Sequence, residues 1–214
     1  MRPPGGGRRV VDSDPSVHYD ARSFGENAVP ERSHRLGSLR LVGVYLFLAA
    51  LIVLARPTPG LLAAGVVVAL AGELVRIWAA GHLQKSVRLA TSGPYAYTQN
   101  PLYLGRLLIL TGLGMAARNS WGLNYVALAA GYAIFFFYYI PRKLRVEGSR
   151  LARIHGDAYE AYRARVPILF PSLRPFPGDR GAWSFGRMIR NQELFVIAGL
   201  ALAFAFLAWK CTQV

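Results

Sequence analysis

Lys143 and Glu147 stand four residues apart, and Glu147 is the one carboxylate between residues 142 and 153. On a helix, this spacing lets the two side chains form a surface pair worth roughly 0.2–0.5 kcal/mol. The alternative is that Glu147 accepts hydrogen bonds from the ribose or amine of a cofactor. Lys143 and the adjacent Arg142 would then bind the anionic group of a substrate. The residue types leave both interpretations open.

A second polar group surrounds Asn100-Pro101. Asn is a favoured N-cap and Pro fits the first helical position, so the pair predicts the start of a helix. A helix N-terminus carries free N–H groups and favours an anionic ligand group. Tyr95, Tyr97 and Tyr103 bring flat amphipathic rings to the same loop. An ordinary capped helix with an interfacial aromatic belt would carry the same residues.

Five apolar segments must position these two groups: Leu41–Ala55, Gly60–Ala80, Leu102–Ala117, Trp121–Ile140 and Leu194–Trp209. A membrane-spanning helix needs about 20 mainly apolar residues. Only Trp121–Ile140 meets this as an uncharged run, and the others reach it by including flanking Tyr, Trp and Arg residues. With 53% hydrophobic residues, the chain is predicted to be all-α and polytopic, with about five transmembrane helices.

The basic residues predict an orientation. Most of the 25 Lys and Arg residues fall in residues 1–40, 81–103 and 141–190, whereas Arg56, Arg118 and Lys210 lie on the opposite side. This asymmetry is typical of cytoplasmic loops. We therefore predict an integral membrane protein of the cell (inner) membrane with a cytoplasmic N-terminus. The net charge of +14 then reflects topology and contact with membrane lipids, and we expect no nucleic-acid partner.

The organisation along the chain follows from these segments. We expect a disordered cytoplasmic tail over residues 1–38, a membrane core over 39–171, a surface linker over 172–190 and a C-terminal transmembrane helix over 191–214. Pro141 is expected to break or end the fourth helix, and Gly148 and Gly156 to interrupt the helix that follows. The histidines show no metal-binding spacing, so no metal site is predicted.

Glu73 and Arg76 lie inside the second apolar segment. Their i, i+3 spacing allows them to pair, which reduces the cost of burying both charges. An ionisable residue in a membrane helix also marks a functional site by default. Lining a substrate cavity is therefore the alternative to structural pairing.

Two stretches of the chain carry a family resemblance. Residues 89–105 read L-A-T-S-G-P-Y-A-Y-T-Q-N-P-L-Y-L-G, which is similar to a loop in which Gly-x-Tyr is followed by Arg-His-Pro-x-Tyr-x-Gly. The second stretch carries, in order, Glu147, Leu151, Gly156, Tyr159, Tyr162, Val166-Pro167 and Pro171. Together they resemble the family that includes isoprenylcysteine carboxyl methyltransferases and phosphatidylethanolamine N-methyltransferases. These are integral membrane enzymes that use S-adenosylmethionine.

The resemblance implies site residues. The S-adenosylmethionine cofactor would be bound by Leu89, Tyr95, Asn100, Pro101, Leu102, Tyr103 and Glu147. Lys143 stands where the isoprenylcysteine branch has a substrate-binding Arg, and we expect Lys143 with Arg142 to hold the acceptor anion. Two departures matter, because Gln99-Asn100 replaces the family's Arg-His and Val87 replaces an upstream His. A titratable imidazole is therefore lost at both places.

These expectations together describe a membrane methyltransferase. The soluble donor would enter from the cytoplasm, and a lipophilic acceptor, such as an isoprenylcysteine-like carboxylate or a related small lipid, would enter from the bilayer. Attack by a carboxylate neutralises charge, which a low-dielectric site favours, so the enzyme's task is mainly positioning and desolvation. The alternatives are a phospholipid N-methyltransferase, a catalytically silent protein that binds lipid or cofactor, and a structural or transport protein of the membrane.

Overall fold

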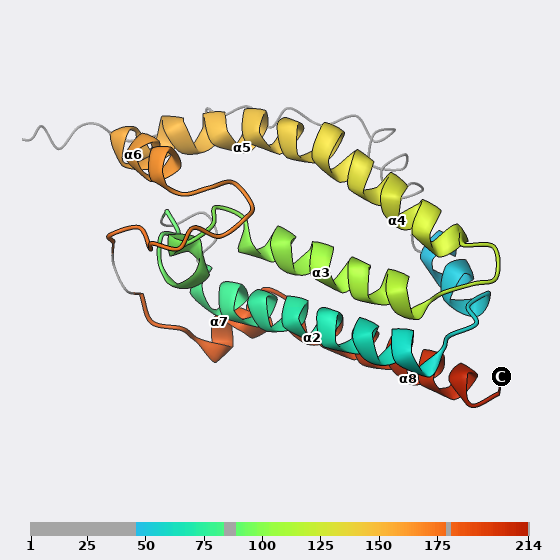
Figure 1. Ribbon diagram of the computed structural model, residues 1–214. Coiled ribbons are helices and arrows are strands. Elements are labelled where there is room, and N and C mark those ends of the chain that lie inside the picture. Colours follow the sequence, from blue (N-terminus) through green and yellow to red (C-terminus); the bar gives the residue numbers. More distant parts are fainter. Residues whose placement is uncertain (1–45, 84–88, 179–180, 214) are drawn as a thin grey trace, which may run out of the picture. The chain divides into compact units, whose positions relative to one another are not determined.

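The computed structural model describes residues 46–83, 89–178 and 181–213, all within one compact unit, Tyr45–Val214. The tail predicted over residues 1–38 lies outside the described residues, as do Val87 and the loop around it. Every regular element of the described part is helical, which confirms the all-α prediction (Figure 1). Residues 46–53 are helical, and the elements that follow are α2 (Pro59–His82), η1 (Gly93–Ala96), α3 (Pro101–Ala116), α4 (Leu123–Ile134), η2 (Phe135–Tyr139), α5 (Ile140–His155), α6 (Asp157–Arg165), α7 (Phe185–Arg190) and α8 (Glu193–Cys211).

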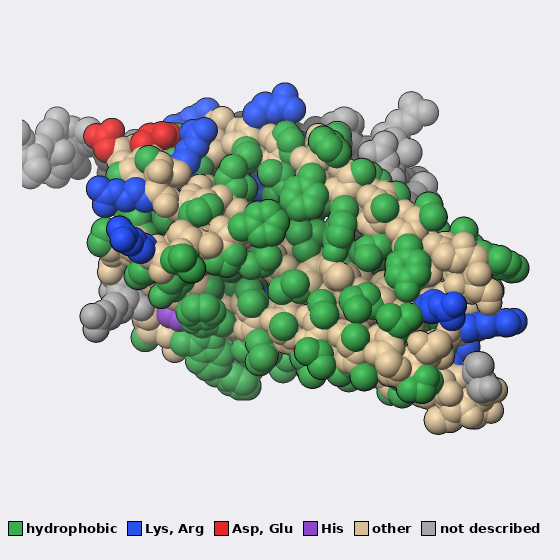
Figure 2. Space-filling view, viewed as in Figure 1, with side chains coloured by type: hydrophobic (Ala, Val, Ile, Leu, Met, Phe, Trp, Pro, Cys, Tyr) green, Lys and Arg blue, Asp and Glu red, His purple; other side chains and the backbone are tan. Residues whose placement is uncertain are grey.

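Three of the described helices are long and apolar enough to cross a membrane: α2, the continuous helix Leu123–His155 and α8. Helix α3 has 16 residues, or about 24 Å of axis, which is short of the roughly 30 Å of a hydrocarbon core. Hydrophobic side chains cover most of the face shown in Figure 2, and Lys and Arg gather toward its upper edge and its ends. This is the surface of a polytopic integral membrane protein.

Helices α2 and α3 pack in direct backbone contact. Glycines face each other across the interface as two antiparallel pairs, Gly65 with Gly112 and Gly72 with Gly105. A Cβ atom on Gly72 would lie 2.6 Å from the Gly105 carbonyl oxygen. Small residues at such positions allow membrane helices to approach closely and gain dispersion contacts. The α2–α3 pair therefore forms a rigid base for the loop that joins the two helices.

The expected break at Pro141 is wrong. The helix runs from Leu123 to His155 without interruption, and one π-helical turn, η2, lies just before the proline. Proline lacks an N–H and its ring collides with the carbonyl four residues earlier, so a regular α-helical turn is unfavourable there. The wider turn, in which the Ile140 N–H donates to the Phe135 carbonyl, accommodates the proline without ending the helix.

The two glycines that follow behave differently from each other. Gly148 lies inside α5 without breaking it. Gly156 ends α5 with φ 49° and ψ −129°, a backbone conformation that residues other than glycine rarely adopt. Helix α6 begins directly after it. The expected interruption is therefore found at Gly156 alone.

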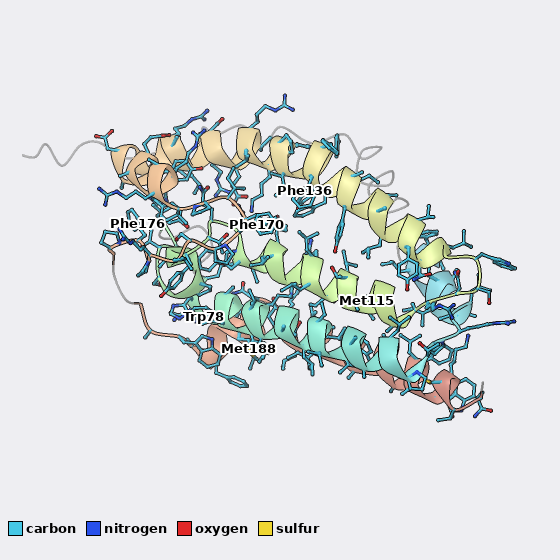
Figure 3. All side chains as sticks on the ribbon, viewed as in Figure 1. Trp78, Met115, Phe136, Phe170, Phe176 and Met188 are labelled. Carbon is cyan, nitrogen blue, oxygen red and sulfur yellow. The ribbon has the colours of Figure 1, made fainter. Side chains whose placement is uncertain are left out.

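The predicted linker over residues 172–190 contains a short helix, α7, that packs on the end of α2. Trp183 Nε1 donates to the Ile77 carbonyl at 3.1 Å, Arg187 Nε to the Gly81 carbonyl at 2.7 Å, and Asn191 Nδ2 to the Ala80 carbonyl at 2.8 Å. The Ala80 and Gly81 carbonyls lie in the last turn of α2, where no later N–H of the helix can reach them. Met188 of α7 is buried beside them (Figure 3). The segment therefore caps α2 as well as connecting to α8.

Candidate functional site

The two stretches singled out in the sequence are joined by backbone hydrogen bonds. The N–H of Gln99 donates to the Pro167 carbonyl at 2.9 Å, that of Ser172 to Tyr97 at 2.9 Å, and that of Phe176 to Ala96 at 2.8 Å. The segment after α6 thus runs beside the loop that leads into α3. Residues from both stretches are held around one corner of the molecule.

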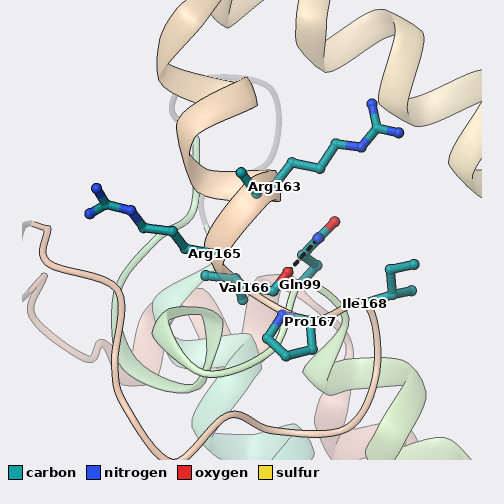
Figure 4. A pocket seen from close by; sticks show the side chains of 7 residues that line it. Gln99, Arg163, Arg165, Val166, Pro167 and Ile168 are labelled. Atoms are coloured by element: carbon teal, nitrogen blue, oxygen red, sulfur yellow. Dashed lines mark hydrogen bonds between the residues drawn. The ribbon is translucent and has the colours of Figure 1, made fainter.

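Side chains of the loop strengthen this junction. Gln99 Nε2 donates to the Val166 carbonyl at 2.6 Å (Figure 4), and Asn100 Nδ2 donates to the Ile168 carbonyl at 2.8 Å. Asn100 does precede α3, as predicted, but its side chain does not cap the helix. Its side-chain amide instead joins the loop before α3 to the segment after α6 through Nδ2. The amide oxygen points in another direction and can accept a second hydrogen bond.

The shallow depression drawn in Figure 4 lies on the outside of this junction. The side chains of Arg163 and Arg165 point away from it in opposite directions (Figure 4). Arg163 forms an ion pair with Glu160 at 3.7 Å. We assign no site there.

A larger cavity of about 530 Å³ lies between the start of α3, helix α5 and the floor formed by α2 and α8. Eight of the residues proposed from the sequence line it: Leu89, Tyr95, Asn100, Pro101, Leu102, Tyr103, Lys143 and Glu147. Arg142 does not line it, and its Nη1 donates to the Tyr138 hydroxyl at 3.1 Å on the exposed surface. The fold therefore brings together every proposed site residue except Arg142.

Lys143 links the two walls of the cavity. Its Nζ donates to Asn100 Oδ1 at 2.7 Å, lies 3.0 Å from Glu147 Oε2 and stands 4.1 Å from the centroid of the Tyr103 ring. The surface pair considered from the i, i+4 spacing thus exists, and it forms at the cavity wall. The Glu147 side chain is 50% exposed, so its carboxylate can accept further hydrogen bonds from a bound molecule.

Tyr95 offers an unused donor at the same cavity. Only 6% of the residue is exposed, and its hydroxyl has no hydrogen-bond partner among the described residues. Burial raises the pKa of Tyr95 above its ordinary value, so the hydroxyl stays protonated at neutral pH. An unpaired buried hydroxyl is costly, and a ligand in the cavity would supply the missing acceptor. The Tyr95 carbonyl is held in place by the Tyr162 hydroxyl at 2.8 Å.

The floor of the cavity is a buried ion pair that joins α2 to α8. Arg76 Nη2 lies 2.8 Å from Glu193 Oε2, and Arg76 Nε also donates to that carboxylate at 3.1 Å. The Glu73 carboxylate lies farther from Arg76, at 3.7 Å, so the expected Glu73–Arg76 pair is present but is the weaker contact. Arg76 and Glu193 both line the cavity.

Glu193 was missed by the sequence reasoning, although a signal for it existed. It is the acidic residue that immediately precedes the last apolar segment, and it lies in the first turn of a membrane helix. A charge at that place calls for a partner, and a second cation–anion pair could have been sought with Arg76.

Aromatic rings of α3 and η2 lie next to the cavity. The Tyr103 hydroxyl is 2.9 Å from that of Tyr139, and the ring of Phe135 is 6.2 Å from the ring of Tyr103. Phe136, labelled in Figure 3, is packed edge-on against Phe135 at 5.3 Å. The arrangement thus combines a polar chamber, with a half-exposed carboxylate at Glu147 and a hydroxyl at Tyr95 that has no partner among the described residues, with an apolar surface suited to a lipid chain. Within the described residues, no group of three or more His, Cys, Asp or Glu side chains could hold a metal ion.

Comparison with known proteins places this site in context. The model of the phospholipid methyltransferase family matches residues 76–158. The chain is 30% identical over 175 residues to the cobalt-zinc-cadmium resistance protein CzcN of Cupriavidus metallidurans, covering 76% of this chain and 77% of that protein. It is 33% identical over 159 residues to the nickel-cobalt-cadmium resistance protein NccN of Alcaligenes xylosoxydans xylosoxydans, covering 68% of each.

A more distant relative is the protein-S-isoprenylcysteine O-methyltransferase of Schizosaccharomyces pombe. It is 27% identical to this chain over 103 residues, which cover 48% of this chain and 41% of that protein. No solved structure is significantly similar to the chain. The family match begins at Arg76 and includes Asn100, Lys143 and Glu147, but it ends before Glu193.

Proposed function

Because the chain belongs to the phospholipid methyltransferase family of membrane proteins, we propose that it transfers a methyl group from S-adenosylmethionine to a lipophilic acceptor. The reaction would take place at the cytoplasmic face of the cell (inner) membrane. The observation that carries this proposal is the cavity of about 530 Å³. It joins a polar chamber suited to a charged soluble molecule to an aromatic surface suited to a lipid.

The residues around the cavity fit the donor. S-adenosylmethionine supplies an electrophilic methyl group on a positively charged sulfur. Glu147 would accept hydrogen bonds from its ribose or amine, and the Tyr95 hydroxyl, which lacks a partner among the described residues, would donate to it. The Leu102 N–H, the first of α3, would face its carboxylate, since the N–H groups of Tyr103 and Leu104 donate to the Asn100 carbonyl. Pro101 and Tyr103 supply apolar surface beside them.

The protein's own contribution is positioning and exclusion of water. Lys143 fixes Asn100 and Glu147 relative to each other, so the two walls of the cavity keep their separation. The buried Arg76–Glu193 pair holds α8 beneath the chamber. Preorganised groups of this kind lower the entropy lost when donor and acceptor meet.

Calorimetry and a product assay test the proposal. Full-length protein in nanodiscs should bind S-adenosylmethionine, and lipid extracts incubated with methyl-labelled donor should gain a labelled lipid that is absent without the protein. Binding without methyl transfer would favour a silent lipid- or cofactor-binding protein. Absence of binding would overturn the proposal. Product analysis also separates a carboxyl acceptor from phospholipid N-methylation, the alternative that the family's description suggests.

A physiological setting is suggested by two relatives that are named for resistance to cobalt, cadmium and other metals. We propose that the methyl transfer supports growth in the presence of such cations. A deletion strain should then grow poorly in cobalt or cadmium salts. Wild-type protein should restore growth, and the Glu147→Gln variant should not. Equal rescue by both would separate any resistance role from the proposed chemistry.

A further inference from the structure

Glu73 is a buried carboxylate that the proposed donor site does not use. It lies on α2 one turn before Arg76 and is 5% exposed. Neither of its carboxylate oxygens has a hydrogen-bond partner among the described residues. Its Oε2 lies 3.7 Å from Arg76 Nε, but that N–H donates to Glu193 instead. Burying an ionised carboxylate in a membrane helix without a hydrogen-bond partner is costly.

The charges in this buried group do not balance if both carboxylates are ionised. Glu193 holds the Arg76 guanidinium through Nη2 at 2.8 Å and Nε at 3.1 Å. The side chains of Glu73, Arg76 and Glu193 are at most 7% exposed. One guanidinium beside two carboxylates leaves one net negative charge away from water, which a compensating positive charge would stabilise. A proton on Glu73 supplies that charge, because Glu193 is already paired.

Glu73 has two charged neighbours among the described residues, Arg76 on α2 and Glu193 on α8. Helix α3 contributes glycine, leucine and isoleucine to the packing against this turn of α2. Arg187 of α7 donates to the carbonyl of Gly81, two turns farther along α2. The protonation of Glu73 is therefore set by its two charged neighbours and by the charge of whatever binds in the cavity beside them.

This buried group forms the floor of the cavity. Arg76 and Glu193 both line it, so a charge in the chamber interacts with Glu73 through buried groups, where electrostatic interactions are stronger than in water. Arg106 and Arg150 also line the cavity, but both are exposed, and water and salt screen exposed charges. A cation bound in the chamber therefore favours the ionised form of Glu73.

We propose that Glu73 carries a proton in the protein without donor, and releases it to solvent when positively charged S-adenosylmethionine binds in the cavity. The inference rests on the proposed function. The donor carries one net positive charge from its sulfonium, ammonium and carboxylate groups, whereas the demethylated product carries none. With the donor, two cations face two carboxylates. With the product, Arg76 and Glu193 balance each other and Glu73 keeps its proton.

The proton makes the site respond to the charge of its ligand. The O–H bond of the Glu73 carboxylic acid breaks, its electron pair stays on the carboxylate, and the proton passes to the buffer. Because the donor complex holds one proton fewer, donor affinity rises with pH by up to about tenfold per pH unit across the titration of Glu73. Product affinity does not share this rise. Glu73 acts through Arg76 and Glu193, so it sets the preference for donor over product and is not a catalytic residue.

Infrared difference spectroscopy tests the proton without any ligand. Full-length protein in nanodiscs, in mildly acidic buffer, is compared with Glu73→Gln. The wild type should show the C=O stretch of a protonated carboxylic acid, which the variant lacks. Glu160→Gln, which replaces an exposed carboxylate of α6, should keep this band. A wild-type difference spectrum without the band would overturn the proposal.

Calorimetry in buffers of different ionisation enthalpy counts the protons released on binding. The wild type should release more protons with S-adenosylmethionine than with S-adenosylhomocysteine, and groups that both ligands affect equally cancel in this difference. In Glu73→Gln the difference should vanish, and the ratio of donor to product affinity should become independent of pH. A merely structural role for Glu73 would change neither quantity. Glu160→Gln should behave as the wild type.

Equal proton release with donor and product in the wild type would contradict the proposal, as would an unchanged difference in Glu73→Gln. If Glu73→Gln fails to fold, the wild-type comparison of the two ligands decides the question. A carboxylic acid band without any donor binding would refute the coupling together with the proposed methyl transfer, while leaving the proton on Glu73. Donor binding without extra proton release would refute the coupling alone.

Discussion

Glu147 is the side chain on which donor binding depends most directly in this proposal. Its carboxylate is half exposed at the cavity wall and has Lys143 as its ion-pair partner. We expect Glu147→Gln to weaken S-adenosylmethionine binding by roughly tenfold, since a hydrogen bond to a charged group is worth about 1.5–3 kcal/mol. The unfolding temperature should stay the same, because partly exposed pairs contribute little.

Calorimetry and a thermal melt of the same preparation check this expectation. Glu160→Gln is the matched control, because Glu160 also pairs with a basic neighbour but lies on α6 away from the cavity. Equal donor affinity in the two variants would exclude Glu147 from the donor site.

Tyr95 allows ligand binding to be separated from folding. Its buried hydroxyl has no partner among the described side chains and backbone groups, so Tyr95→Phe should leave stability unchanged or raise it by about 1 kcal/mol. Donor affinity should fall in the same variant. Tyr162→Phe should instead lower the stability, because the Tyr162 hydroxyl donates a hydrogen bond to the Tyr95 carbonyl. Chemical denaturation and calorimetry on both variants measure the contrast, and a loss of stability in Tyr95→Phe would mean that its hydroxyl is already satisfied.

At the residue scale, the sequence predicted several residues that line the cavity but not the contacts between distant ones. Asn100 and Glu147 could be singled out because a helix-start pair and a lone carboxylate are local signals. The contact of Arg76 with Glu193 could not, because the two residues are 117 positions apart and only the packing of α8 on α2 brings them together. Arg142 and Lys143 are neighbours in sequence, yet the rotation of about 100° between successive residues of a helix places only Lys143 at the cavity.

Elements α2 and α3 depend on their facing glycines. Gly72→Ala would place a Cβ atom 2.6 Å from a backbone oxygen of α3 and 2.8 Å from the Leu108 Cβ, so the helices would have to separate. We expect a loss of roughly 1–3 kcal/mol and weaker donor binding, because α3 carries the Asn100 corner. Gly131→Ala on α4 is the control, since nothing lies within 4 Å of the added atom. Its expected effect is a small gain in helix propensity of about 0.5–1 kcal/mol, and equal melting temperatures for the two variants would contradict the close packing.

A buried ion pair between Arg76 and Glu193 joins α2 to α8. Glu193→Ala leaves the Arg76 guanidinium buried without its carboxylate at 2.8 Å, which should cost about 3–5 kcal/mol. The double variant Arg76→Met/Glu193→Leu should recover much of this stability, because an apolar pair of similar volume needs no desolvation. Denaturation of the single and double variants in detergent checks both statements. Glu160→Ala, which breaks an exposed pair, should change little, and an effect as large as that of Glu193→Ala would argue against the buried pair.

Element positions were predictable to the extent that they depend on apolar length. The apolar segments 60–80, 102–117 and 194–209 correspond to α2, α3 and α8. The continuity through Pro141 was not predictable, because it requires a π-helical turn just before the proline. Helix α7 also escaped prediction, since its six residues are stabilised mainly by capping the distant end of α2.

The two ends of the described unit differ in chemistry. Lys143, Glu147 and the Arg76–Glu193 pair gather at the end where α2 finishes and α3 and α8 begin. At the other end, the Arg56 N–H donates to the Arg118 carbonyl at 2.7 Å and Lys210 donates to the Val53 carbonyl. The three cations that the sequence placed on one side of the membrane therefore do lie together. The cavity opens at the opposite end.

The long helix relates this cavity to the membrane. Leu123–His155 has 33 residues, or about 50 Å of axis, which exceeds the roughly 30 Å of a hydrocarbon core. Its last turns are charged, so they extend beyond the bilayer and carry Lys143 and Glu147 toward the aqueous side. From the distribution of basic residues, we propose that this side is the cytoplasm.

Cys211 tests this orientation, because it is the single cysteine of the chain and ends α8 at the end away from the cavity. A membrane-impermeant maleimide should label it in right-side-out vesicles and not in sealed inverted ones. Arg153→Cys in a Cys211→Ser background should show the reverse pattern, because Arg153 is exposed on the charged part of α5. Cys211→Ser alone should remain unlabelled in both. Labelling of Cys211 from the cytoplasmic side would place the cavity mouth outside the cell, where a soluble cytoplasmic methyl donor could not reach it.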